Sequence, residues 1–250
     1  MKRYIPNIIT LLNVFCGCVA TVFAVLNQLE LAALFVFLGI VFDWFDGLAA
    51  RILDVHSELG IQLDSLADMI TSGLVPGIVM FQLLGMSMTG GWNLNFSASI
   101  SESVLWVGGK FTPLPFLGFL ITLASAYRLA RFNIDENQVS SFIGLPTPAN
   151  ALMILSFPLI LMYQQNEVLN EIILNQWFLI GITFLSAFLL NSKIELFAFK
   201  FKNWAFKENA TRYILIIVSL VLLLTMKFLA VPIIVVFYVI GSMVGNIARS

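Results

Sequence analysis

The sequence predicts an all-α fold, a polytopic bundle of membrane-spanning helices. Three observations predict it: 60% of the 250 residues are hydrophobic, 11% are charged, and the mean hydropathy is +0.96. A soluble domain carries about 25% charged residues, so this composition excludes a water-soluble globule. The formal net charge of −1 also excludes a global basic field that would gather nucleic acid.

Eight apolar segments come close to the about 20 residues that a helix needs to cross the hydrocarbon core. The first follows Lys2 and Arg3 without a small-residue cleavage site, so we expect a retained membrane helix. The last two are separated only by Lys227 and its neighbours, and a single broken or interfacial helix would give the same pattern, so six to eight spans are expected. The expected spans lie near residues 7–28, 31–53, 60–85, 112–132, 147–164, 172–190, 211–226 and 229–247, with the longest loop at 86–111.

The positions of lysine and arginine predict the orientation, because basic flanks are retained on the cytoplasmic side. With eight spans and the N-terminus inside, only Lys110 and Lys227 fall outside. Residues 191–210 alternate Lys with Phe and Trp, a pattern typical either of an amphipathic segment on an anionic leaflet or of a plain cytosolic loop. The eleven basic residues expected on the cytoplasmic side are Lys2, Arg3, Arg51, Arg128, Arg131, Lys193, Lys200, Lys202, Lys207, Arg212 and Arg249.

Four aspartates interrupt the cytoplasmic ends of the second and third expected spans: Asp43, Asp46, Asp64 and Asp68. One ionised carboxylate in a span costs roughly 2.5–3.5 kcal/mol, so four must be compensated. At about 100° per residue, the second-span pair and the third-span pair each occupy one face of a helix. The short connection at 54–59 makes the two helices antiparallel neighbours, so these faces can meet.

Carboxylates crowded into one cleft need a cation, and a cluster of oxygen ligands selects hard divalent ions such as Mg²⁺, Mn²⁺ or Ca²⁺. Gly47 and Ala50 leave a notch on the same face, and Arg51 offers a planar fork that suits phosphate. An isolated aspartate could instead be a helix cap, and the small residues could serve helix packing. The set as a whole predicts a metal-assisted phosphate site at the membrane surface.

These residues carry a family resemblance. Asp43-x2-Asp46-Gly47-x2-Ala50-Arg51-x8-Gly60-x3-Asp64-x3-Asp68 matches, at eight fixed positions across 26 residues, the motif of the CDP-alcohol phosphotransferase family. The resemblance implies a membrane-embedded six-helix core, usually homodimeric, that transfers a substituted phosphate from a CDP-linked donor to an alcohol and releases CMP.

The resemblance also implies roles for the motif residues. Asp43, Asp46 and Asp64 would ligate a pair of Mg²⁺ or Mn²⁺ ions, and Asp68 would act as ligand and general base. The CDP group would be held by Gly47, Ala50, Arg51 and Gly60. The chain is expected to form a single catalytic domain over 1–250, with the core at about 1–190 and two extra C-terminal spans at about 211–247.

The first expected span carries a polar strip of Asn7, Thr10 and Asn13, which share one helical face. It resembles the opening of CDP-diacylglycerol-using family members, which implies that Asn7 and Thr10 lie near the donor diphosphate. Alternatively, Asn7 caps the helix and the other two pack against neighbours.

A second stretch resembles the phosphatidylserine synthase branch of the family. It comprises residues 127–133 and 142–149, in which Thr147 is expected to cap a helix that begins at Pro148. The resemblance implies that Arg128, Arg131 and Asn133 hold the acceptor or a phosphate, although both arginines could be ordinary positive-inside residues. Asn150 departs from the small residue expected there.

The leading interpretation is therefore transfer of the phosphatidyl group of CDP-diacylglycerol to L-serine, at the cytoplasmic face of the cell membrane, by a homodimer that binds no nucleic acid. Glycerol 3-phosphate or an inositol compound as acceptor is the alternative, which would require a basic pocket for a second phosphate. A cation transporter is a remote alternative, because transport favours carboxylates at the midplane on broken helices or inverted repeats.

Overall fold

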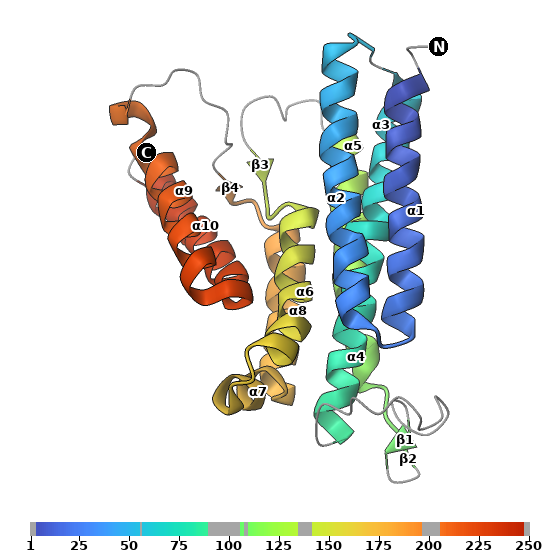
Figure 1. Cartoon of the computed structure of the whole chain (residues 1–250), viewed down its shortest axis with the longest axis vertical. Helices are drawn as coiled ribbons and strands as arrows, with labels where there is room; N and C mark the ends of the chain where they lie inside the picture. Colours follow the sequence, from blue (N-terminus) through green and yellow to red (C-terminus); the bar gives the residue numbers. More distant parts are fainter. Residues whose placement is uncertain are drawn as a thin grey trace.

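The computed structural model describes residues 4–55, 57–89, 106–107, 110–134, 142–196 and 206–247. Over this part of the chain the prediction of an all-α bundle is confirmed, and each of the eight expected spans contains a helix (Figure 1). The only strands among the described residues form two antiparallel pairs of two residues each. They are β1 (Trp106–Val107) with β2 (Lys110–Phe111), and β3 (Phe142–Ile143) with β4 (Glu195–Leu196).

The helices follow one another with short connections. A π-helical turn at Met69–Leu74 joins α3 to α4, and 3-10 turns at Leu114–Gly118 and Lys227–Leu229 precede α5 and α10. The helix bounds are α1 (Ile5–Val25), α2 (Leu29–Ile52), α3 (Glu58–Asp68), α4 (Val75–Thr89), α5 (Phe119–Ile134), α6 (Thr147–Tyr163), α7 (Glu167–Ile173), α8 (Gln176–Asn191), α9 (Phe206–Met226) and α10 (Ala230–Ile247).

Four stretches of the described chain are long and apolar enough to cross a membrane: Ile5–Val25, Leu29–Ile52, Glu58–Met88 and Tyr213–Met243. The helix pair α7 and α8, bent by 60°, would make a fifth span if it crosses as one unit. The last stretch contains both α9 and α10, which lie side by side (Figure 1). The turn between them begins at Lys227, whose φ is 51°.

Two helices differ in detail from the expected spans, whose ends were predicted only to within several residues. Helix α4 continues to Thr89, beyond the expected end at 85, so the expected loop begins later. The expected span at 172–190 is broken, because the Asn175 side chain accepts hydrogen bonds from the backbone N–H groups of Trp177 and Phe178 (2.9 and 3.2 Å) and so starts α8 as a new helix. The middle of the expected amphipathic segment, residues 197–205, lies outside the described residues.

The first two helices pack closely through small residues. A Cβ added at Gly39 of α2 would lie 2.7 Å from Asn13 Oδ1 of α1 and 2.7 Å from Thr71 Cγ2 of the π-helical turn. Only glycine fits this three-way contact, as is typical of helices that approach closely in a membrane. The polar strip of α1 is thereby brought against the span that carries Asp64 and Asp68.

The span formed by α3, the π-helical turn and α4 is the centre of the bundle, because 78% of its apolar window is buried. The corresponding share for the α9 and α10 stretch is 6%, so this pair lies at the periphery. The buried part of this stretch is the π-helical turn and α4, whereas α3, which carries the aspartates, has only Ala67 buried and lies at the end of the bundle where α1 begins and α2 ends (Figure 1).

The segment before α6 is fixed against the end of α8. Gly144 has φ 74°, and its N–H donates to the carbonyl of Ile194 (2.9 Å). A Cβ at this position would lie 2.6 Å from the carbonyl oxygen of Leu190, so glycine is required both for the backbone conformation and for the close approach. This anchor sets where α6 begins, and therefore where Thr147 lies.

Candidate active site

Three of the four predicted aspartates form a compact cluster between α2 and α3. One carboxylate oxygen each from Asp43, Asp46 and Asp64 lies within 4.8 Å of the others. Asp46 is buried, Asp43 is half-buried and Asp64 is exposed, so the cluster opens on one side. The predicted meeting of the two aspartate-bearing faces is observed in the structure.

Asp46 is held in place by α1. The hydroxyl of Thr10 donates to Asp46 Oδ2 at 2.5 Å, and the Asp46 side chain is only 6% exposed. Thr10 Oγ1 also lies 3.0 Å from the carbonyl oxygen of Pro6, one turn earlier. The resemblance implied that Thr10 lies near the donor diphosphate, whereas the structure gives its hydroxyl a position against a candidate metal ligand.

The next polar layer toward the middle of the bundle joins α1 to the π-helical turn. The Thr71 hydroxyl donates to Asn13 Oδ1 at 2.8 Å, and both side chains are fully buried. This contact fixes α1 against the central span one turn away from Thr10. The polar strip of α1 thus supports the aspartate cluster from behind.

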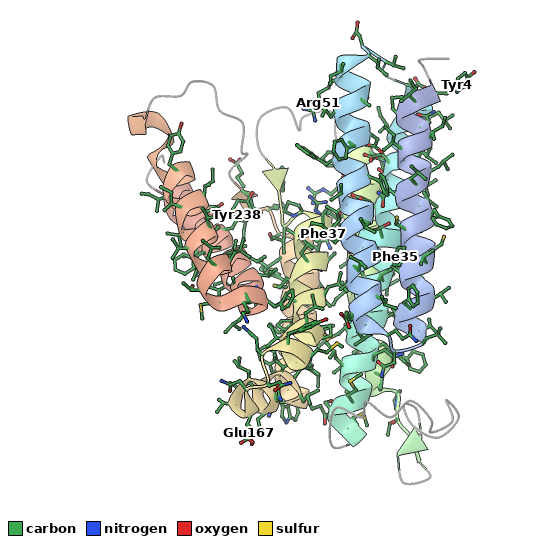
Figure 2. The ribbon with its side chains drawn as sticks, viewed as in Figure 1. Tyr4, Phe35, Phe37, Arg51, Glu167 and Tyr238 are labelled. Atoms are coloured by element: carbon green, nitrogen blue, oxygen red, sulfur yellow. The ribbon has the colours of Figure 1, made fainter. Side chains whose placement is uncertain are left out.

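The expected notch on α2 is open. A Cβ added at Gly47 would meet only one neighbouring atom, Arg51 Nη2, at 3.7 Å. The exposed Arg51 side chain folds back over this turn, with Nε donating to the Gly47 carbonyl at 3.1 Å (Figure 2). A flat or anionic group can therefore approach the backbone of α2 beside Asp43 and Asp46.

Gly60 has a different setting from Gly47. Its backbone N–H donates to the hydroxyl of Ser57, the N-cap of α3, at 3.0 Å. A Cβ at Gly60 would lie 3.0 Å from Ser57 Oγ and 3.3 Å from Asn7 Oδ1. Gly60 therefore allows the start of α3 to approach Asn7, which places Asn7 at the mouth of the cluster.

Asp68 lies one turn beyond Asp64 and contacts a second group of residues. Thr147 Oγ1, at the start of α6, donates to Asp68 Oδ2 at 3.5 Å, and the positive charge of Arg128 on α5 acts on the same carboxylate. The expected capping arrangement is wrong, because Pro146 occupies the N-cap and Thr147 is the first helical residue. The Thr147 hydroxyl serves Asp68 instead of its own helix, a contact that sequence spacing did not indicate.

The two expected acceptor arginines line one small cavity, of about 20 Å³, which is room for about one water molecule. Asn191 and Ser192, from the end of α8, also line it, and neither was predicted. In the sequence, the only feature that could have indicated these two residues is that they are a polar pair at the end of an apolar span. Among the described residues, Arg128 Nε has no hydrogen-bond partner, so one guanidinium donor is available toward this cavity.

Asn133 is engaged elsewhere. Its Oδ1 accepts a hydrogen bond from Ser65 Oγ at 2.9 Å, and its Nδ2 donates to Gln62 Oε1 at 3.2 Å. These contacts tie the end of α5 to α3. Asn133 is therefore not among the residues that line the cavity of the two arginines, and its two hydrogen bonds join α5 to α3.

The aspartate cluster fits a hard divalent cation. Its ligand atoms are all carboxylate oxygens, and the side chains of Asp43 and Asp64 lie within hydrogen-bonding reach of each other. Two carboxylates this close need a shared proton or a cation between them. Oxygen-only ligands favour Mg²⁺, Mn²⁺ or Ca²⁺ over softer metals.

Comparisons with known proteins agree with this geometry. A sequence model described as CDP-alcohol phosphatidyltransferase matches residues 3–189. A CDP-diacylglycerol–serine O-phosphatidyltransferase of Bacillus subtilis (strain 168) is 33% identical over 161 residues, which cover 62% of this chain and 76% of the relative.

Two further relatives carry the same name. The one from Methanocaldococcus jannaschii is 31% identical over 170 residues, which cover 68% of each chain. The one from Helicobacter pylori (strain 26695) is 32% identical over 152 residues, 60% of this chain, and the match spans about half of that relative, 54%.

Proposed function

Because this chain belongs to the CDP-alcohol phosphatidyltransferase family, we propose that it transfers the phosphatidyl group of CDP-diacylglycerol to L-serine, giving phosphatidylserine and CMP. The names of its relatives support the two substrates. One structural observation carries the proposal: the cluster of Asp43, Asp46 and Asp64 lies beside the open backbone at Gly47, with Asp68 one turn deeper.

The proposed reaction is an attack of the serine hydroxyl oxygen on the phosphatidyl phosphorus, which breaks the bond to the CMP oxygen. Asp43, Asp46 and Asp64 would hold the metal, which we take to be two Mg²⁺ or Mn²⁺ ions; when bound, they neutralise charge on the diphosphate and on the departing CMP. Thr10 keeps Asp46 in its rotamer, and Gly47, Ala50 and Arg51 would receive the CDP group.

Asp68 is the proposed general base. It lies one turn from Asp64, and Thr147 donates a hydrogen bond to one of its oxygens, which leaves the other oxygen free to take the proton of the serine hydroxyl. The charge of Arg128 acts on the same carboxylate, so a single guanidinium would link the base to the acceptor site.

Arg128 and Arg131 are proposed to bind the serine carboxylate, because a guanidinium fork matches a carboxylate in geometry and charge. The cavity that they line is smaller than serine, so we expect the exposed Arg131 side chain to move outward when serine binds. An acceptor with its own phosphate, such as glycerol 3-phosphate, would need further cationic side chains at this cavity, and among the residues that the structure describes only these two arginines line it.

We further propose that the protein acts as a homodimer in the cell membrane, with the site at the cytoplasmic face. The orientation is supported by Arg51, Arg128, Arg131 and Lys193, which lie at the helix ends nearest the site, whereas Lys227 lies at the opposite end. The dimer rests on the family resemblance alone.

The test is a CMP-release assay with the purified full-length protein, CDP-diacylglycerol, Mg²⁺ and one candidate alcohol at a time. We expect release with L-serine and not with glycerol 3-phosphate or inositol. Release with glycerol 3-phosphate alone would overturn the acceptor assignment and retain the family. No release with any acceptor, from protein that binds Mn²⁺, would overturn the proposed reaction.

A further inference from the structure

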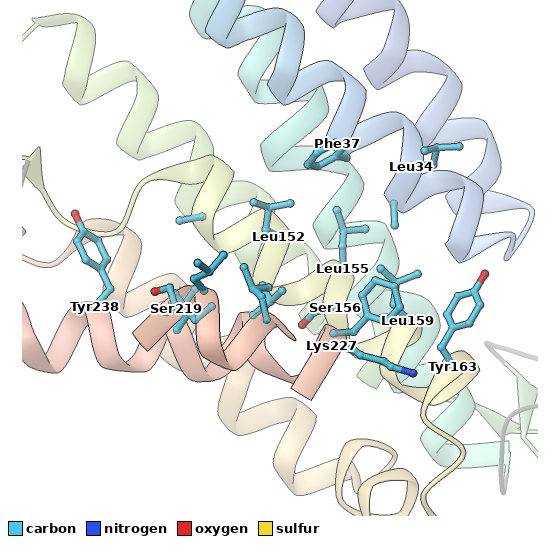
Figure 3. A pocket seen from close by; sticks show the side chains of 18 of the residues that line it. Leu34, Phe37, Leu152, Leu155, Ser156, Leu159, Tyr163, Ser219, Lys227 and Tyr238 are labelled. Carbon is cyan, nitrogen blue, oxygen red and sulfur yellow. The ribbon is translucent and has the colours of Figure 1, made fainter. Parts of the chain in front are cut away.

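A large apolar cavity of about 1300 Å³ separates the α9 and α10 pair from α2 and α6 (Figure 3). Its walls are leucine, isoleucine, valine, phenylalanine and alanine side chains from these four helices. The matched family region ends at residue 189, so one wall of the cavity belongs to helices beyond the family match. Several of its lining side chains are exposed, among them Phe37 (54%) and Leu220 (58%), so the space is open at the surface, and in a membrane an apolar group fills it.

The cavity has two different ends. At one end Pro146 and Ala149 line it, and these residues flank Thr147, whose hydroxyl contacts Asp68. At the other end lie Tyr163 and Lys227 (Figure 3), and Phe228 packs against Tyr163 there. The first end therefore lies at the start of α6, on the opposite face of this helix from the Thr147–Asp68 contact, because Ala149 points about 200° away from Thr147. A chain that runs from the active site to the cavity has to pass around the start of α6.

The far end is closed by contacts between α6, α2 and the turn that joins α9 to α10. The Tyr163 hydroxyl donates to Glu30, and the Tyr163 and Phe228 rings are 5.5 Å apart between centroids. Gln164 Nε2 donates to the carbonyl of Met226 at 2.6 Å, which ties the end of α6 to the same turn. The far end is thus closed by hydrogen bonds and a ring contact between α2, α6 and the turn.

The length of the cavity suits one extended acyl chain. From Pro146 to Tyr163 the helical rise of about 1.5 Å per residue gives about 26 Å. One leaflet of the hydrocarbon core is about 15 Å deep, so an extended lipid chain that starts at the active site fits within the cavity. A globular or charged ligand would be a poor match for walls that are mostly apolar and carry only the hydroxyls of Ser156, Ser219 and Tyr238 besides the groups at the far end.

We propose that α9 and α10 complete a binding site for one acyl chain of the lipid donor, and that Tyr163, Glu30 and the Lys227–Leu229 turn limit the length of chain that it accepts. The inference rests on the proposed function, because it assigns the donor's chain to the space that begins beside Thr147. Selectivity comes from shape, since the surrounding lipid is as apolar as the cavity.

A matched pair of substitutions on α9 tests this assignment. Leu220 lines the cavity and is 58% exposed, whereas its neighbour Val221 is 52% exposed and does not line it. Leu220 lies about 10 Å along the helix from Lys227, so Leu220→Trp shortens the usable space to about 16 Å. Val221→Trp adds the same ring on the outer face.

The assay is CMP release by the full-length protein at saturating serine, with dioleoyl and didecanoyl CDP-diacylglycerol compared. We expect Leu220→Trp to lower kcat/KM for the dioleoyl donor about tenfold, as overpacking a filled site does, and to change the value for the didecanoyl donor less than twofold. Val221→Trp is expected to leave both values within twofold. If Leu220→Trp does not accumulate in the membrane, Leu223→Trp, another cavity-lining position, replaces it.

Equal effects of Leu220→Trp on the two donors would overturn the inference. A changed oligomeric state with an unchanged preference for donor chain length would also overturn it, because a second copy of the protein would then fill the cavity. These outcomes are distinct from failure of the proposed function, in which the unsubstituted protein would release CMP from neither donor.

Discussion

The hydrogen bond from Thr10 to Asp46 links the first helix to metal binding, and it can be removed without changing the shape of the side chain. Thr10→Val replaces a hydroxyl by a methyl group at a position that is 3% exposed. The substitution leaves Asp46 Oδ2 without its 2.5 Å donor, and Asp46 is itself only 6% exposed, so water can replace the hydroxyl only in part.

The size of the effect follows from the kind of bond that is lost. A hydrogen bond to a charged group contributes about 1.5–3 kcal/mol, and a lost partner of a metal ligand typically lowers metal affinity about 10- to 100-fold. We therefore expect the Mg²⁺ concentration for half-maximal CMP release to rise about 10- to 100-fold. Turnover at saturating Mg²⁺ should return to within a few-fold of the unsubstituted protein, because in the structure the Thr10 hydroxyl is directed to Asp46.

The assay is a Mg²⁺ titration of CMP release, paired with direct Mn²⁺ binding measured by electron paramagnetic resonance. Thr21→Val is the control, because the Thr21 hydroxyl bonds only within α1, to the Gly17 carbonyl at 2.8 Å, away from the cluster. An unchanged metal dependence in Thr10→Val would refute the idea that α1 positions a metal ligand. A loss of turnover that saturating metal does not restore would refute it too, and would favour direct contact with the donor.

Four further outcomes are expected in the CMP-release assay. Chelation with EDTA should abolish activity, and Mg²⁺ or Mn²⁺ should restore it, since the cluster consists of oxygen ligands only; full activity in excess EDTA would contradict the metal site. Asp68→Asn should lower kcat at least about 100-fold while donor binding, measured by equilibrium dialysis, survives; wild-type turnover would place the base elsewhere. Arg128→Lys should raise the serine KM more than the donor KM, because a point charge does not replace a bidentate fork, and a uniform loss would assign this arginine to the donor phosphates. Gly47→Ala should raise the donor KM while thermal stability changes little, because an added Cβ meets only Arg51 Nη2 at 3.7 Å; an unchanged donor KM would show that the notch is not used.

The fold class and the aspartate cluster could be predicted because both depend on local sequence. Apolar runs predict helices, and Asp43 and Asp46 share a helical face because of their spacing alone. The short connection between α2 and α3 then decides that this face meets Asp64. These steps need no information about distant segments of the chain.

Other features could not be predicted because they depend on contacts between distant segments. Thr10 and Thr147 reach Asp46 and Asp68 from helices 36 and 79 residues away in the sequence. Asn133 was expected at the acceptor, but the alignment of α5 with α3 gives it Ser65 and Gln62 as partners. Asn175 is a residue type that often caps a helix, so it could have predicted the break before α8. The apolar composition of 172–190 instead predicted one continuous span.

The π-helical turn at Met69–Leu74 lets the two helices that it joins, α3 and α4, face different directions around the same axis. A π-helical turn holds an extra residue, so α4 is rotated by about 100° from the course that an unbroken α-helix would take after Asp68. Deleting one residue from this turn would restore α-helical register and swing the packing face of α4 away from α5 while the carboxylates stayed aimed at α2. During evolution, α4 can therefore change the helices that it packs against without changing the direction of the aspartates on α3. We expect sequence variation among relatives to be greater in α4, after the turn, than in α3, before it.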